Sequence, residues 1–173
     1  MDSINRNQPE HNHEDLTGRD AVKRIKHIVD AAKSCFFISG GNDVRPMSVL
    51  DIDDAGSLWF MSSADSTKNA EVEADPKVRL YFQATAHSGF LYLDGIATLS
   101  RDRARIHQLW SPELKTWFTE GEDDPRITLI RVVPTEGYYW DNKHGNFVSG
   151  LKIMVGAAVG KTLDDSIEGR VAP

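Results

Sequence analysis

Apolar residues recur at helical spacing near the start of the chain. Starting from Val22, they occupy positions i, i+3, i+6 and i+7, and Thr17 stands three residues before Asp20. The spacing places one apolar stripe on a helix, and the Thr–Asp pair resembles a capping box. The pattern therefore predicts a helix over about residues 18–33.

From Ser34 onward the pattern changes to short apolar runs separated by Gly, Asn and Asp. Such runs are typical of strands, because these turn residues tolerate left-handed backbone. We expect Gly95 at a bulge or bend, and we expect Pro134 and Gly137 to interrupt the last apolar run. The predicted strands are 34–40, 44–52 and 57–62, which would form a meander, then 77–84, 88–100, 127–133 and 138–140.

Short helical segments are predicted between and after these strands. A helix over 66–74 would end before Pro76. A helical segment around Ile106 would be followed by a second that restarts at Ser111–Pro112, as an N-cap and first helical position. An amphipathic pattern near 151–159 predicts a last helix before a polar end.

About six antiparallel strands within roughly a hundred residues would leave exposed edges in a flat sheet, and closure into a barrel avoids them. We therefore predict a mainly β (α+β) domain, a small barrel flanked by helices. Residues 1–15 lack apolar periodicity, and we expect a disordered leader there.

Composition narrows the possible functions. The chain has 173 residues and a formal net charge of −6, which suits one globular domain and argues against general binding to nucleic acid or to membrane surfaces. A single cysteine, Cys35, excludes an intramolecular disulfide and a cysteine-built metal cage. No apolar run is long enough to span a bilayer, and the polar start differs from a signal peptide. We expect a cytoplasmic protein without a metal site.

A hydroxyl-rich turn stands between strand 57–62 and helix 66–74, in the stretch FMSSADSTKNAEV. Its serines and Thr67 are donors, the helix N-terminus offers unpaired N–H groups, and Lys68 adds a full positive charge. Together these groups could cradle a phosphate. The alternative is an ordinary helix capped by Asp65 or Ser66, and capped helices greatly outnumber phosphate sites.

Two further features stay open at this level. Arg45 lies in an apolar run and needs a partner or water, while Pro46 beside it places the strand at an edge or a bulge. Tryptophans could pack in the core or bind a flat aromatic ligand. They are Trp59, Trp110, Trp117 and Trp140.

Four segments in order resemble the pyridoxamine 5′-phosphate oxidase-like superfamily of flavin-binding split barrels. They are VRPMSV, LWFMSSADSTKNAEVEADPKVRLYF, LYLDGIATL and LIRVVPTEGYYWD. The stretch HQLWSPELKTWFTEGEDDP resembles, more narrowly, the general stress protein 26 branch. The resemblance covers about residues 16–160. It implies a six-stranded antiparallel split β-barrel with flanking helices, assembled as a homodimer with FMN in clefts between the subunits.

On this basis an FMN-binding split-barrel domain would occupy 16–141, followed by a C-terminal helix and polar tail at 142–173. The resemblance implies that Trp140 packs near the flavin from the partner chain, and that Trp110 and Trp117 reach the cleft. It also implies cofactor contacts by Arg45, Pro46, Met47 and Ser48 along the ring and ribityl chain, by Phe60, Met61 and Ser62 at the ring, and by Ser66, Thr67 and Lys68 at the phosphate.

The chain departs from true pyridoxamine phosphate oxidases after Trp140, where DNKHGNFVSGL lacks their Arg-x-His motif. That absence argues against oxidation of pyridoxamine phosphate but leaves flavin binding in place. We expect an FMN-binding, stress-associated protein that acts as a flavin-dependent oxidoreductase on an unknown small-molecule substrate, with no side-chain acid or base assigned. The alternatives are a non-catalytic FMN or FAD reservoir, and an interaction dimer with an empty cleft.

Overall fold

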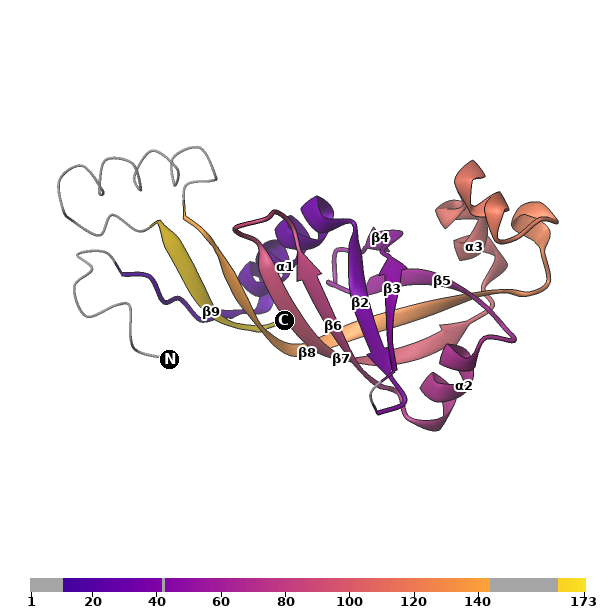
Figure 1. The fold of residues 1–173 in the computed structure, drawn as a ribbon, viewed down its shortest axis with the longest axis horizontal. Helices are drawn as coiled ribbons and strands as arrows, with labels where there is room; N and C mark the ends of the chain where they lie inside the picture. The colour runs from indigo at the N-terminus through magenta and orange to yellow at the C-terminus, as the bar shows by residue number, and fades with distance from the viewer. Residues whose placement is uncertain (1–10, 42, 144–164) are drawn as a thin grey trace.

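The computed structural model describes residues 11–41, 43–143 and 165–173. They form one mixed sheet of nine strands with three α-helices (Figure 1). The strands are β1 (Leu16–Thr17), β2 (Ser34–Ser39), β3 (Asp43–Ser48), β4 (Asp51–Ile52), β5 (Leu58–Ser63), β6 (Lys77–Gln83), β7 (Phe90–Ser100), β8 (Ile127–Asn142) and β9 (Ser166–Ala172). The helices are α1 (Gly18–Ala32), α2 (Thr67–Ala74) and α3 (Arg103–Leu109), followed by the 3-10 turns η2 (Pro112–Thr116) and η3 (Gly121–Asp123).

The long strand β8 organises the sheet. One of its edges pairs with β7 along almost its whole length, while the other pairs first with β5 and then with β9. Figure 1 shows β8 running the length of the molecule, with β9 at one end and α3 near the other. The predicted mainly β class is confirmed. The predicted six antiparallel strands correspond to β2, β3, β5, β6, β7 and β8, and β4 and β9 add two further antiparallel pairs, with β5 and β8. Among the described ladders none joins β3 to β5, so the sheet curves without closing.

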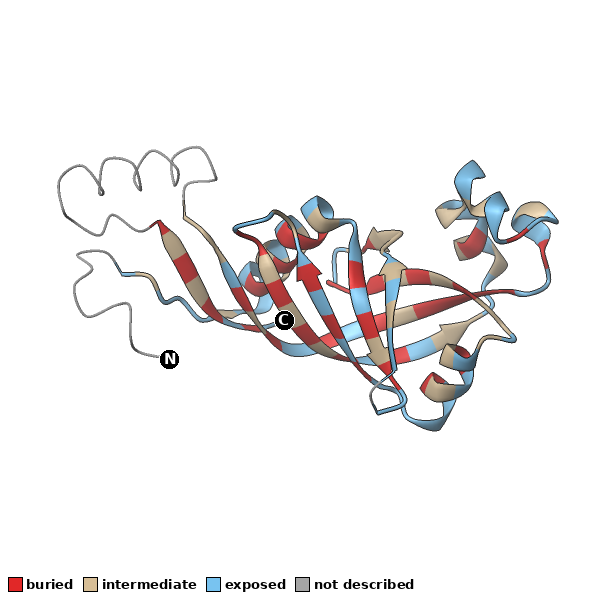
Figure 2. Cartoon of the chain, in the orientation of Figure 1, coloured by how far each residue is buried: buried red, intermediate tan, exposed pale blue. Residues whose placement is uncertain are grey.

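Buried and exposed residues alternate along the strands, as the red and blue bands of Figure 2 show, and the buried side chains form the main core. On β6, Val78, Leu80 and Phe82 are buried and their neighbours are exposed, as predicted. Helix α1 covers this core with the stripe that includes Ile25 and Ile28. The prediction of a capping box is wrong. Thr17 precedes α1 but its side chain makes no capping hydrogen bond, and its backbone pairs with Ala172 in the ladder between β1 and β9.

Two predictions about strand order are corrected. Segment 44–52 is broken after Ser48. The Val49 amide still donates to the Lys33 carbonyl (2.9 Å), as the next pair of the β2–β3 ladder, but the Leu50 amide donates to the Trp59 carbonyl of β5 (2.9 Å). As a result the first part of the segment, β3, pairs with β2, and the second part, β4, pairs with β5, so the predicted meander is present only with a broken middle strand.

Strand β8 also runs without a break through the two residues that were expected to interrupt it. Pro134 lies opposite Gly95. The register of the β7–β8 ladder shifts between Asp94 and Gly95, and this shift confirms the bulge predicted there. A proline lacks an N–H group, and a bulge is one of the few interior positions where a strand can accommodate it.

The end of the chain is a strand rather than a polar tail. In β9, Ile167, Gly169 and Val171 face inward, and the Glu14 amide donates to the Glu168 carbonyl (2.8 Å). A Cβ on Gly169 would lie 1.9 Å from the carbonyl oxygen of Glu14, so only glycine allows this approach. Part of the expected leader is therefore held against β9, while the helix predicted near 151–159 lies outside the described residues. Among the helices that the structure describes, none has the length and apolar character to cross a bilayer.

Candidate functional site

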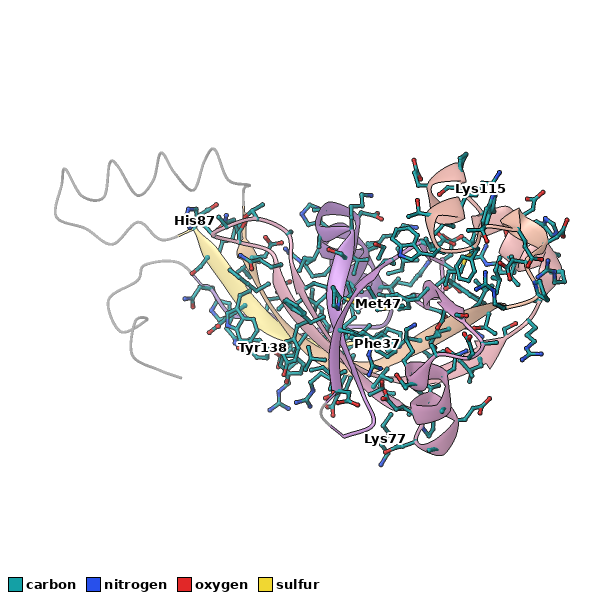
Figure 3. The ribbon with its side chains drawn as sticks, turned by 45° about the vertical axis from the view of Figure 1, so that its right-hand side comes forward. Phe37, Met47, Lys77, His87, Lys115 and Tyr138 are labelled. Carbon is teal, nitrogen blue, oxygen red and sulfur yellow. The ribbon has the colours of Figure 1, made fainter. Side chains whose placement is uncertain are left out.

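A cavity of about 410 Å³ lies where β3, β5, the start of α2, η2 and the residue just before β8 meet. Figure 3 labels Met47 on β3 and Lys115 on η2, two of the elements that contribute to it. Its lining divides by chemistry between these elements. The end of β5, the first residues of α2 with its N-cap, and the residue before β8 contribute hydroxyls and cations: Ser62, Ser63, Ser66, Lys68 and Arg126. The other elements and β5 contribute apolar groups: Pro46, Met47, Leu50, Met61, Leu114, Trp117 and Phe118, with Ser48 beside them.

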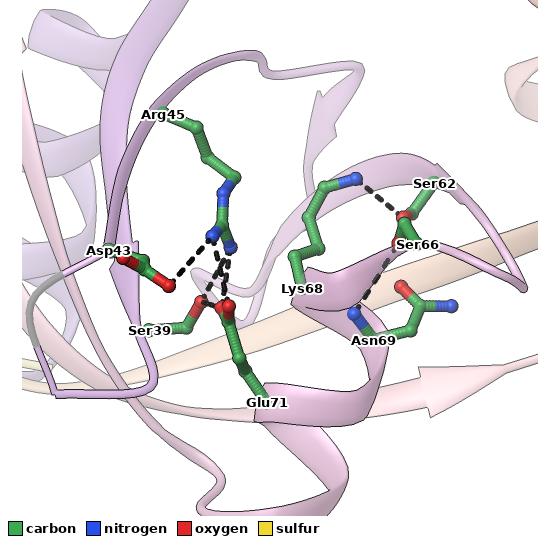
Figure 4. A network of polar contacts seen from close by, with 8 residues as sticks. All are labelled: Ser39, Asp43, Arg45, Ser62, Ser66, Lys68, Asn69 and Glu71. Atoms are coloured by element: carbon green, nitrogen blue, oxygen red, sulfur yellow. Dashed lines mark hydrogen bonds and ion pairs between the residues drawn. The ribbon is translucent and has the colours of Figure 1, made fainter.

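The hydroxyl-rich turn is held in place by short-range hydrogen bonds. Ser66 is the N-cap of α2 and its Oγ accepts from the Asn69 amide (3.4 Å), which confirms the predicted cap. Ser62 Oγ lies 3.0 Å from Ser66 Oγ and accepts from Lys68 Nζ at 2.7 Å (Figure 4). The two serines thereby direct the ammonium group toward the turn.

Backbone and buried side chains brace the same turn from behind. The Ala64 amide donates to the Arg126 carbonyl (2.7 Å), and Thr128 Oγ1 donates to the Ser62 carbonyl (3.0 Å). Buried Asn69 donates through Nδ2 to Thr128 Oγ1 (2.8 Å). Since each of these bonds joins the turn or α2 to β8 or to the residue just before it, the sheet fixes the position of the turn.

Two cations line this cavity, Lys68 and Arg126, and they differ in whether a described carboxylate pairs with them. Lys68 is half-buried, and burial lowers the pKa of its ammonium group, with the nearby Arg45 guanidinium acting in the same direction and Glu71 opposing it. Among the described residues no carboxylate lies within ion-pair distance of Lys68. Arg126, in contrast, donates through Nη2 to Asp124 Oδ2 at 2.6 Å. A desolvated ammonium without a carboxylate favours the approach of an anion.

Arg45 does not line this cavity. Its guanidinium grips both carboxylate oxygens of Glu71, with Nη1 at 2.6 Å and Nη2 at 3.1 Å, and Nη1 also donates to Ser39 Oγ at 3.0 Å. The two possibilities that the sequence left open, a partner or water, are thus decided in favour of a partner. The Arg45 guanidinium, together with Ser39, holds the pKa of the Glu71 carboxyl down to about 2.

The structure divides the other predicted site residues into two groups. Those that line the cavity together are Pro46, Met47, Ser48, Met61, Ser62, Ser66, Lys68 and Trp117. Phe60 is fully buried and packs edge-on against Phe37 at 5.5 Å between centroids. Thr67 points to solvent, Trp110 packs in a second apolar cluster around Ile106, and Trp140 lies in another region.

The sequence analysis missed four residues of this lining, namely Leu50, Leu114, Phe118 and Arg126. Leu114 and Phe118 could have been found, because Leu114, Trp117 and Phe118 stand at positions i, i+3 and i+4, the spacing of one helical face. Arg126 follows an acidic loop, and no sequence signal shows that the loop folds back beside the β5–α2 turn.

Trp140 belongs to an exposed row of aromatic rings on the outer face of the sheet. Register places Phe36, Tyr81, Tyr92 and Tyr138 side by side across β2, β6, β7 and β8, and Trp140 lies 4.7 Å from the Tyr138 ring. We call these five residues the aromatic face. Phe36 and Trp140 are 57% and 41% exposed. Four of the five, all except Tyr138, line a second cavity of about 460 Å³, which shares Pro46 with the first.

Both the fold and the sequence identify the class of protein. The family model described as pyridoxamine 5′-phosphate oxidase like matches residues 20–164, and the chain belongs to this family. The expected resemblance to the general stress protein 26 branch is confirmed at the level of the fold. A protein of Jannaschia sp. CCS1 assigned to general stress protein 26 superposes with a TM-score of 0.76 at 22% identity, over 90% of this chain and 100% of that one.

Two other similar proteins add detail. The general stress FMN/FAD binding protein of Xanthomonas citri superposes with a TM-score of 0.62 at 24% identity, over 73% of this chain and 91% of that one. Protein bli-3 of Neurospora crassa is 25% identical over 104 residues, which is 55% of this chain. The alignment spans about half the length of bli-3 (50%).

Proposed function

We propose that this chain binds a flavin nucleotide, FMN in the first place, with the terminal phosphate at the β5–α2 turn. The observation that carries the proposal is Lys68, a half-buried cation that is held by Ser62 and has no carboxylate partner in the described part of the chain. A phosphate dianion at this position would accept charge-assisted bonds from Lys68 and from the turn hydroxyls. The family match, and the similar Xanthomonas citri protein described as FMN/FAD binding, support the choice of a flavin.

The apolar part of the lining suits the flat ring system of the same ligand. Met47, Met61 and Trp117 lie on three different elements around one cavity, and thioethers and indoles make favourable contacts with aromatic rings. Trp117 is 67% exposed in the chain alone, so it has surface left to bury against a ligand. FAD would share the ring and the first phosphate, and it is the second candidate cofactor.

We further propose that the protein acts as a homodimer in which the aromatic face is covered by a second copy. Exposed apolar surface of this extent marks an interaction site, and aromatic residues dominate the buried centres of interfaces. Trp140 would then approach the flavin of the partner rather than that of its own chain. Pro46, which lines both cavities, would join the interface to the cofactor site.

A bound flavin supplies redox chemistry, and the protein supplies position and electrostatics. We propose an FMN-dependent oxidoreductase whose substrate is a small molecule, active in a stress response as the names of the relatives suggest. The competing function is a flavin reservoir. It is favoured by one observation, that the cationic Arg45 is bound to Glu71 and is not directed into the cavity to tune a flavin.

Two measurements test these proposals. Titration of the purified protein with FMN and with riboflavin, followed by flavin fluorescence, should show clearly tighter binding of FMN. Equal affinities would contradict the phosphate site, and no binding would contradict the flavin. Stopped-flow mixing of the FMN-loaded protein with NADH or NADPH then separates the two functions, because a reservoir binds flavin but shows negligible turnover.

A further inference from the structure

Helix α2 carries a cation and an anion that would ordinarily bind each other. Lys68 and Glu71 are three residues apart, a spacing at which side chains of opposite charge on a helix surface are neighbours. In the structure they do not pair, as Figure 4 shows. Lys68 donates to Ser62 at 2.7 Å, and Glu71 accepts from Arg45 and Ser39, both at 2.6 Å.

The arrangement around Glu71 is much stronger than the bond it replaces. Arg45 presents two nitrogens to the two carboxylate oxygens, a bidentate geometry that a lysine cannot offer. The side chains of Arg45 and Glu71 are only 22% and 17% exposed, which limits solvent screening of the pair. A Cβ on Gly40 would lie 2.8 Å from Glu71 Cγ, so the stem of Glu71 packs closely against the β2–β3 turn.

We propose that Arg45 is a positioning residue that holds the Glu71 carboxylate away from Lys68, and so keeps the Lys68 ammonium free to bind a phosphate. The inference rests on the proposed function, because the anion it concerns is the terminal phosphate of the flavin nucleotide. Arg45 thereby sets the preference for a phosphorylated over an unphosphorylated ligand without touching either one.

A purely structural role for the same pair makes the opposite predictions. If the Arg45–Glu71 pair only fastened α2 to β3, the loss of either partner would disturb the β5–α2 turn equally. If Arg45 instead restrains Glu71, the loss of Arg45 matters only while the Glu71 carboxylate is present to pair with Lys68. The two roles are therefore separated by removing the carboxylate.

The experiment compares the full-length chain with Arg45→Met, Glu71→Gln and the double variant. The readout is the ratio of the riboflavin and FMN dissociation constants, measured by flavin fluorescence. Arg45→Met should lower this ratio roughly tenfold or more, since a charged hydrogen bond to phosphate is replaced by an internal ion pair. Glu71→Gln should keep the ratio within about twofold or raise it, and the double variant should restore it to within about threefold.

Asp43→Asn serves as the matched control. Asp43 lies 3.7 Å from Arg45, is largely exposed, and makes no contact with Lys68, so the ratio should not change. A low ratio in Glu71→Gln, or in the double variant, would overturn the inference. Glu71→Gln alone decides the question if Arg45→Met does not fold.

Failure of the inference can be distinguished from failure of the proposed function. A wild-type protein that binds FMN no better than riboflavin contradicts the phosphate site, and the inference falls with it. A wild-type protein that prefers FMN, combined with a double variant that does not recover the preference, contradicts only the role assigned to Arg45.

Discussion

The β5–α2 turn and the aromatic face are two kinds of unfinished surface. At the turn most polar groups are hydrogen-bonded within the chain, and the Lys68 ammonium group has no carboxylate partner among residues 11–41, 43–143 and 165–173. On the aromatic face the rings contact each other, yet Phe36 and Trp140 remain about half exposed. The first surface carries a positive charge with no described anion against it, and the second exposes apolar rings that no described residue covers.

The difference indicates what each surface binds. A single charge held in a braced turn suits a small anionic group, because a preformed site loses little conformational entropy when the ligand binds. A row of rings across four strands suits a second large surface, since the free energy gained by burying apolar groups is roughly proportional to the area removed from water. The following experiments separate the two regions, from the largest expected effect to the smallest.

Phe60→Ala should cost about 3–5 kcal/mol of unfolding free energy, measured by urea denaturation. Phe60 is fully buried against Phe37 on the inner face of β5, so the variant leaves a cavity in the core. The neighbouring variant Met61→Ala is the control, because Met61 is half-buried and lines the flavin cavity. It should cost less stability and weaken flavin more. A small loss of stability in Phe60→Ala with a large loss of flavin would instead support the ring contact that the resemblance implied.

Lys68→Met should weaken FMN by about 1.5–3 kcal/mol while barely changing riboflavin, since it removes one charged hydrogen bond and keeps the apolar stem. Titration by flavin fluorescence measures both affinities. Lys77→Met is the control, because Lys77 is exposed and does not line the cavity. Equal weakening of the two flavins in Lys68→Met would show that the phosphate lies elsewhere.

Trp140→Ala and Trp117→Ala should have opposite effects on dimerisation and on flavin binding, because the two tryptophans lie in different regions. Trp140→Ala should weaken the proposed dimer by about 2 kcal/mol, as expected for a tryptophan at the centre of an interface, and sedimentation velocity over a concentration series would measure it. Trp117→Ala should leave the dimer intact and weaken flavin instead, because Trp117 lines the cavity. A monomeric wild-type protein, or dimer loss in Trp117→Ala alone, would contradict this assignment.

Local pattern was enough to predict most elements of this fold, and non-local pairing was not. The alternation on β6 and the apolar stripe of α1 are properties of neighbouring residues, and both were confirmed. Strand β9 was missed because SIEGRVA contains charges and a glycine. Its strand character depends on pairing with β8 and β1, which come from distant parts of the chain. The unbroken path of β8 through Pro134 likewise depends on the register shift against β7, where Thr135 is the extra residue on β8.

The candidate site shows the same limit. The hydroxyl turn with Lys68 could be recognised because its donors are contiguous in the sequence. The partner of Arg45 could not, since Glu71 lies 26 residues away and the sequence offers several other carboxylates. The aromatic face likewise appears only once register aligns four strands.

The pair of Arg45 and Glu71 gives the smallest effect, on acid stability. The folded-state pKa of Glu71 is about 2, below its ordinary value of 4.5, so the carboxylate stabilises the fold above about pH 4.5. This contribution is lost as the pH falls from 4.5 toward 2. After allowance for partial exposure we expect about 1–2 kcal/mol. Glu71→Gln should therefore be less stable than the wild type at pH 7, and the difference should shrink toward pH 2 in urea denaturation measured at each pH. A difference that stays constant with pH would mean that packing against Gly40, rather than the charge of Glu71, anchors α2 to the sheet.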